Sequence, residues 1–316
     1  MLYPISIPIP ESVDDHVGYI DAAGELIVPP KYAGGAYFFE GVACVLRPDG
    51  ASGFIDLQGV VVVPFEFQGL SRFHNGVCAI GGYYIDHSGH RLIERRFLIA
   101  GEFCEGRAFV SLDGDSMGYI DLNGQFAIPA EFEAAHPFSE GLAAVRRDGY
   151  WGYVTRDGAV AIPFEFGGPR AQAFRNGLGG VQADGGWGFI DHSGRWRVTP
   201  RFEDIGQFSE GYAPVMLNGK WGMIDTEGGF RIPVRYEKLG GFRDGLAAAT
   251  LENKAGFICR HGRWIVPARY DECYRFSGEL AMVVDGDVYQ YIRRDGRAVW
   301  RSEPLAGRLT PPRHWE

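Results

Sequence analysis

The sequence predicts an all-β protein built as a tandem array of about nine repeats, each a three-stranded antiparallel meander of roughly 34 residues. Three observations support this fold class. A tripeptide of an aromatic residue (once Met), Ile or Val, and usually Asp recurs at steps of 30 to 36 residues; a glycine follows three residues after each copy; and proline ends many of the apolar stretches between them. The tripeptides begin at residues 19, 54, 84, 119, 153, 189, 223, 257 and 291.

The first strand of each repeat ends in the tripeptide, and the glycine after it predicts a β-hairpin. In Asp121-Leu122-Asn123-Gly124 the Asp side chain can accept a hydrogen bond from the backbone two residues on, and Gly supplies the positive φ that the loop needs. All nine repeats carry this glycine, at Gly24, Gly59, Gly89, Gly124, Gly158, Gly194, Gly228, Gly262 and Gly296.

The second strand ends at Ile-Pro or Val-Pro in most repeats, as at Ile232-Pro233. Proline has no N–H to donate to a further strand, so it ends the pairing there. An aromatic residue such as Tyr236 follows three positions later.

A connector of about ten residues then closes with Phe-x-x-Gly, as from Phe208 to Gly211, and leads into the third strand. The second residue of that strand is always small, for example Ala213, which indicates that another backbone or ring lies close to it. A tight turn such as Asn218-Gly219 returns the chain to the next tripeptide.

One such meander cannot bury enough surface to fold alone, so we expect residues 1–301 to stack into a single body. An open, curved superhelix (a solenoid) is favoured, because nine units exceed the usual four to eight blades of a propeller and propeller blades have four strands. A closed, propeller-like ring is the alternative. Residues 302–316 are expected to form either a cap on the last repeat or a flexible tail.

The fullest repeats read Lys220-Trp221-Gly222-Met223-Ile224-Asp225 and Trp187-Gly188-Phe189-Ile190-Asp191, and Trp151-Gly152-Tyr153 is a third copy of Trp-Gly. Together with Ile-Pro and Phe-Ser-Glu-Gly, these motifs resemble the bacterial WG-repeat (KWG) family over about residues 3–300. The resemblance implies a β-repeat array, and it implies little chemistry because the family is largely of unassigned function.

Charge and cysteine usage narrow the partners and the compartment. The net charge of −9 disfavours nucleic acid and anionic membranes, which both bind basic surfaces. The N-terminus lacks a signal-peptide pattern, and the five cysteines form no C-x-x-C pair. We therefore expect a cytoplasmic protein without disulfides, zinc or another cofactor.

Several motifs look catalytic but fall at hairpin turns. Gly114-Asp115-Ser116-Met117-Gly118 matches G-x-S-x-G, yet no helix is expected after it. Asp-His-Ser at 86–88 and at 191–193 occupies the same turn as other repeats. One Asp per repeat is too sparse for calcium, and a glutamate that recurs in Phe-x-Glu-Gly suits a structural role. No catalytic or metal-binding residue is predicted.

Positions that break the repeat are the candidate binding residues, because the fold alone does not require them. Arg95 and Arg96 stand where other repeats have proline, and Arg170 and Gln172 lie in an enlarged connector. Arginine is enriched at binding hot spots. Ordinary surface variation is the competing interpretation.

The leading hypothesis for function is a non-catalytic scaffold that binds another protein, such as an immunity or adaptor protein whose partner is a toxin or effector. An alternative is a glycan- or peptidoglycan-binding module, which requires Trp151, Trp187 and Trp221 to be exposed. An enzyme is the third hypothesis, and it requires one concave pocket with titratable groups of shifted pKa.

Overall fold

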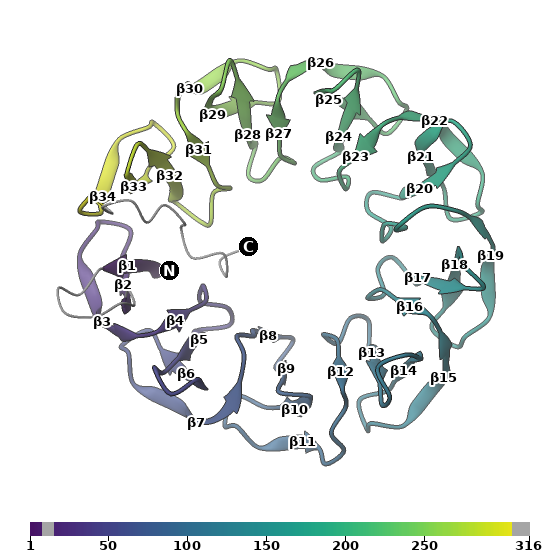
Figure 1. The fold of residues 1–316 in the computed structure, drawn as a ribbon, viewed down its shortest axis with the longest axis horizontal. Coiled ribbons are helices and arrows are strands. Elements are labelled where there is room, and N and C mark those ends of the chain that lie inside the picture. Colours follow the sequence, from purple (N-terminus) through teal and green to yellow (C-terminus); the bar gives the residue numbers. More distant parts are fainter. Residues whose placement is uncertain (8–15, 305–316) are drawn as a thin grey trace.

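The computed structural model describes residues 1–7 and 16–304, which form nine small antiparallel β-sheets arranged in a closed ring (Figure 1). Each sheet is one blade, and the blades follow one another in chain order. The first strands of the chain lie beside the last ones in the ring (Figure 1). The described residues contain no helix long and apolar enough to cross a membrane.

Within a blade the strands run in chain order from the centre of the ring to its outside (Figure 1). Blades one to four contain β1 (Tyr3–Ile7), β2 (His16–Ile20), β3 (Leu26–Tyr32); β4 (Gly34–Gly35), β5 (Val42–Leu46), β6 (Ala51–Asp56), β7 (Val61–Gln68); β8 (Phe73–His74), β9 (Val77–Ile80), β10 (Tyr83–Ile85), β11 (Arg91–Ile93); and β12 (Ile99–Ala100), β13 (Ala108–Ser111), β14 (Met117–Ile120), β15 (Phe126–Phe132).

Blades five to nine repeat the pattern. They contain β16 (Ala134–Ala135), β17 (Leu142–Arg147), β18 (Tyr150–Thr155), β19 (Val160–Phe166); β20 (Gly179–Ala183), β21 (Gly186–Ile190), β22 (Trp196–Phe202); β23 (Asp204–Ile205), β24 (Tyr212–Leu217), β25 (Lys220–Asp225), β26 (Phe230–Tyr236); β27 (Lys238–Leu239), β28 (Leu246–Leu251), β29 (Lys254–Cys259), β30 (Trp264–Tyr270); and β31 (Glu272–Cys273), β32 (Ala281–Asp285), β33 (Val288–Ile292), β34 (Ala298–Arg301).

The prediction of three strands per unit was wrong for seven of the nine blades, which have four. The extra strand is two residues long and lies in the connector at the inner edge of the blade, as β16 does beside β17. Two residues show no period in the sequence, which is why the strand was missed. Blade one has no such strand, and in blade six a single bridge between Gly167 and Gln182 replaces it.

The predicted hairpin turn is confirmed. Asp21 Oδ1 accepts hydrogen bonds from the N–H groups of Ala23 (2.8 Å) and Glu25 (2.9 Å). The five other repeats with Asp at this position make the same two bonds. The glycine of all nine turns has a φ between 72° and 91°, the left-handed region that favours glycine.

The glycine of Trp-Gly is required by a close approach of the outer strand. A Cβ on Gly256 would lie 2.4 Å from the carbonyl oxygen of Val266, where a bulge before proline brings the backbone inward. Seven blades have this glycine, and the two without it have Tyr83 and Gln290 there. Those two blades also lack the Ile-Pro or Val-Pro ending, but blade six keeps Gly188 with Val198-Thr199-Pro200, so the glycine does not require that ending.

The favoured open superhelix is not what the structure has; the ring is closed, as the alternative proposed. Among the described residues blade one has no inner strand, and the backbone of β1 contacts blade nine. Tyr289 Oη accepts from Ser6 N (2.5 Å) and donates to Ser6 O (2.6 Å), and Tyr291 Oη donates to Pro4 O (2.7 Å). These pairs are 283 to 287 residues apart, so no sequence period announces them.

An apolar cluster accompanies these hydrogen bonds across the closure. It joins Tyr3 and Ile5 of blade one to Leu280, Met282 and Tyr289 of blade nine. The chain after β34 continues to contact its own blade, since Ser302 is buried and its N–H donates to Tyr289 O (2.9 Å). Residues 305–316 of the predicted cap or tail lie outside the described residues, so that expectation stays a prediction.

Replacing Tyr289 and Tyr291 together by phenylalanine should weaken the closure. The change leaves Ser6 N–H, Ser6 O and Pro4 O without these partners, which should lower the free energy of unfolding by about 1–3 kcal/mol. Denaturant-induced unfolding of the two proteins measures the loss. Tyr150→Phe, at an exposed tyrosine, is the control; an equal loss in control and double variant would contradict the closure.

Candidate functional site

Blades one, three, four and five each contact the next blade through the hydroxyl of a tyrosine at the first position of the tripeptide. Tyr153 Oη donates to Gln172 O (2.8 Å), and Tyr19, Tyr84 and Tyr119 donate in the same way to carbonyl groups 17 residues ahead. Burial raises the pKa of these phenols, so they remain protonated donors.

A second link between blades comes from the carboxylate of the connector. Glu40 accepts from Asn75 N (2.6 Å) and Gly76 N (3.0 Å) in the next blade, and Glu140 accepts from Gly177 N (2.9 Å). Glu105 and Glu210 cap Gly141 and Gly245 likewise. The structural interpretation of this recurring glutamate is confirmed.

The two Asp-His-Ser sequences do not form triads. His87 stacks on Phe73 with ring centroids 4.1 Å apart, and its Nε2 lies 3.5 Å from Glu40 Oε2 of the preceding blade. His192 repeats this arrangement with Phe174 and Glu140. Each histidine therefore reinforces the link between blades, and the Ser193 hydroxyl donates to Asp191 of its own turn (2.6 Å).

The G-x-S-x-G sequence is also a turn. Ser116 lies between β13 and β14, and its backbone N–H donates to Asp113 Oδ1 at 2.9 Å. A strand follows it where a nucleophile elbow needs a helix. Within the described ranges, no three His, Cys, Asp or Glu side chains gather in a way that could hold a metal ion.

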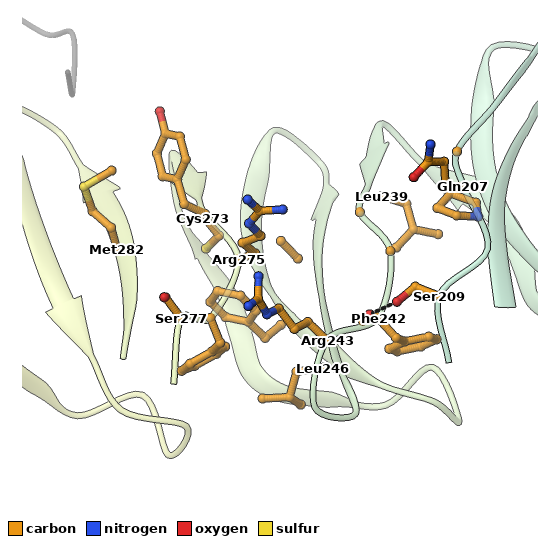
Figure 2. A pocket seen from close by; sticks show the side chains of 18 of the residues that line it. Gln207, Ser209, Leu239, Phe242, Arg243, Leu246, Cys273, Arg275, Ser277 and Met282 are labelled. Atoms are coloured by element: carbon orange, nitrogen blue, oxygen red, sulfur yellow. Dashed lines mark hydrogen bonds between the residues drawn. The ribbon is translucent and has the colours of Figure 1, made fainter. Parts of the chain in front are cut away.

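A cavity of about 1600 Å³ lies among the inner connectors of several blades, and Figure 2 shows part of it. Among the described residues, its lining includes connector residues of blades two, three, four, six, seven, eight and nine, with five basic and three acidic side chains. These charged residues are Arg72, Arg175, Lys238, Arg243, Arg275, Glu102, Asp271 and Glu272.

In blades five to nine, serine and arginine alternate at the second residue of Phe-x-x-Gly, and in blades six to nine this residue lines the cavity. Ser139 and Ser209 each donate to the carbonyl of the next blade's phenylalanine, and the Ser209–Phe242 bond of 2.6 Å is drawn in Figure 2. Arg175 and Arg243 occupy the same position in the intervening blades. Their exposed side chains are thus not committed to that bond.

The residues predicted for binding lie elsewhere. Arg95 and Arg96 are exposed in the connector between β11 and β12, where Arg96 Nε donates to Gly81 O at 3.1 Å. Arg170 and Gln172 lie between β19 and β20. Arg170 pairs with Asp204 (2.5 Å), and Gln172 is buried and donates to Ile205 O (3.1 Å).

The structure therefore does not bring the four predicted residues into one site, and none of them lines the cavity. Arg170 and Gln172 both bind the following blade. Sequence reasoning missed Arg175, Arg243 and Arg275. The alternation of serine with arginine in Phe-x-x-Gly was the signal for the first two.

The tryptophans proposed for glycan stacking are mostly hidden. Trp151 and Trp187 are each only 3% exposed, and Trp221 is half-buried at the cavity wall. The glycan hypothesis loses two of its three main residues.

Among the five cysteines, all of them free, Cys259 stands out because it occupies the Asp position of the hairpin turn. Burial raises the pKa of its thiol, but hydrogen bonds from the backbone of His261 and Arg263, together with the Arg263 side chain, outweigh this effect and lower it overall. Burial raises the pKa of Cys44 to about 11 and that of Cys78 to about 12.

Cys259 should consequently be the thiol that iodoacetamide alkylates fastest near neutral pH, because the thiolate is the reacting form. Peptide mapping by mass spectrometry over a time course measures the rate at each site. Cys259→Ser should remove the fastest phase alone. Faster labelling of Cys44 or Cys78 than of Cys259 in the folded protein would contradict the assignment.

Comparison with known proteins gives a family and a fold. The family model described as "WG containing repeat" matches residues 18–47, 53–80, 117–151, 151–187, 187–221, 221–254 and 256–289. No curated protein matches the chain.

Among solved structures, one titled "Crystal structure of the eukaryotic initiation factor" has a TM-score of 0.63 and 10% identity over 95% of this chain and 96% of its own. At that identity the likeness concerns the fold alone. The designed protein Ika8 (TM-score 0.46, 12% identity, 85% and 87% covered) and BamB from Moraxella catarrhalis (0.45, 14%, 76% and 83%) are more distant and carry no argument.

Proposed function

We propose that this chain, which belongs to the family of WG-containing repeat proteins, is a non-catalytic scaffold that binds another protein. The observation that carries this proposal is the cavity among the inner connectors, which several blades line together. The motifs that look catalytic are used in turns and between blades, while the cavity presents charged side chains to solvent. Repeat arrays of this kind commonly offer one large binding surface.

A narrower form of the proposal is a cytoplasmic immunity or adaptor protein that binds one toxin or effector. The acidic composition and the reduced cysteines support it. An immunity protein must block one partner at a defined stoichiometry, so this form requires a complex of fixed composition.

The cavity fits the enzyme hypothesis, but the pKa shifts of the groups that line it do not favour a nucleophile. Burial raises the pKa of the Cys273 thiol, which keeps it protonated, and Lys254 lowers the pKa of Asp271. A nucleophile needs an adjacent base or a lowered pKa. The glycan alternative retains Trp221 alone among its three proposed residues.

Affinity capture with the immobilised full chain from its native host should return one dominant protein. Size-exclusion chromatography with light scattering of the two purified proteins should then give a complex of fixed stoichiometry. The matched control is the Tyr289→Phe/Tyr291→Phe variant, which tests whether capture needs the closed ring.

A capture with no dominant protein would count against the scaffold function. Sedimentation of the chain with isolated peptidoglycan separates the glycan alternative, for which we expect no binding. Strong cosedimentation that Trp221→Ala abolishes would favour the glycan module instead.

A further inference from the structure

We infer that the cavity binds an acidic segment of the partner protein, whose carboxylates pair with Arg175, Arg243 and Arg275. The inference rests on the proposed scaffold function and specifies its face and the chemistry of its ligand. It starts from the charge of the cavity, which is opposite in sign to that of the whole chain.

The cavity is locally basic once the lining residues that already form ion pairs are set aside. Arg72 and Glu102 pair with each other (2.8 Å), and Asp271 pairs with Lys254 (2.6 Å). Of the other charged residues in the described lining, Glu272 is the one acidic group, and it accepts from the Tyr274 hydroxyl (2.8 Å). Arg175, Lys238, Arg243 and Arg275 therefore face the cavity of a chain whose net charge is −9.

These arginines are available to a ligand. Arg175, Arg243 and Arg275 are exposed, and within the part of the chain that the structure describes none of them forms an ion pair. Arg243 and Arg275 come from blades eight and nine and project into the same cavity (Figure 2). Two guanidinium groups with no carboxylate near them repel each other weakly in water. A carboxylate placed between them would attract both groups and make the electrostatic energy favourable.

Other arginines of similar exposure show the contrast. Arg260 pairs with Glu210 (2.7 Å), and Arg294 pairs with Asp244 (3.2 Å), both across a boundary between blades. Within the described residues, other arginines such as Arg95 and Arg301 likewise form no ion pair. Arg175, Arg243 and Arg275 differ from them because they line one cavity together.

The size and the surroundings favour a peptide. A cavity of about 1600 Å³ exceeds the ~300–1,000 Å³ typical of small-molecule sites. Phe39, Leu70 and Trp221 add partly exposed apolar surface to the cavity, which suits the side chains that flank acidic residues in a peptide. A nucleic acid would meet the negative field of the whole chain, since its binding requires many phosphate contacts.

Fluorescence anisotropy of a fluorescein-labelled hexaglutamate peptide, titrated with the full chain, tests this inference. At about 0.01 M salt the Debye length is ~30 Å, so electrostatic binding is strongest there. Arg243→Glu/Arg275→Glu should weaken binding by ~10-fold or more. Arg195→Glu/Arg301→Glu changes the net charge equally outside the cavity and should leave binding within about twofold.

Thermal unfolding verifies that each variant is folded, and Arg243→Gln/Arg275→Gln replaces the reversal if it is not. Equal binding by cavity variant and control, or no binding of hexaglutamate by the wild type, would overturn the inference. So would full displacement by millimolar inorganic phosphate, which indicates a small-anion site, or tighter binding of oligothymidylate, which indicates nucleic acid. Hexaglutamine should not bind.

The scaffold function and this inference fail separately. An empty affinity capture removes the scaffold function, whereas the peptide titration decides the chemistry of the cavity. A captured partner that the cavity variant binds as well as the wild type does would leave the scaffold function standing and overturn the acidic segment as its ligand.

Discussion

The contact of each blade with the next is the interaction on which the rest of the structure depends. A sheet of three or four short strands buries too little surface to be stable alone. The Tyr153 hydroxyl reaches the inner connector of the following blade, and Glu140 caps the N–H of Gly177 there. Tyrosine bonds of this kind recur in blades one, three and four. Serine bonds such as Ser209 to Phe242 O and ion pairs such as Arg260–Glu210 join other neighbouring blades.

If each blade contacted only the next one, the first and the last blade would each have one side without a neighbour. Closure of the ring brings these two sides into contact. The ninth repeat has Tyr289-Gln290-Tyr291 where other repeats have Trp-Gly, and both tyrosine hydroxyls reach the backbone of β1. The ninth repeat, which departs from the Trp-Gly pattern, is thus the one that faces the beginning of the chain. Arg170 also lies where the sequence departs from the repeat, and it too contacts another blade, because it pairs with Asp204 of the next blade.

Features whose cause lies within a few residues could be predicted from the sequence. The Asp–Gly turns and the fold class followed from local chemistry, as at Asp21 and Gly24. Closure and the cavity could not, because they depend on residues far apart in the chain, such as Ser6 and Tyr289, which are 283 residues apart. The inner strands were missed because two residues show no period. For the site, binding residues were sought among positions that depart from the repeat. This criterion selected Gln172, which is buried. It overlooked Arg243, which lines the cavity at a repeated position of Phe-x-x-Gly.

Distances between equivalent turns test the closed ring most directly. Spin labels on unnatural residues at positions 23 and 295 report the separation of blades one and nine by double electron–electron resonance. Positions 58 and 88, the same turn in blades two and three, give the separation of ordinary neighbours. A closed ring predicts the same distance for both pairs. A distance between 23 and 295 as long as that between 23 and 157, which lie in blades one and five, would contradict it.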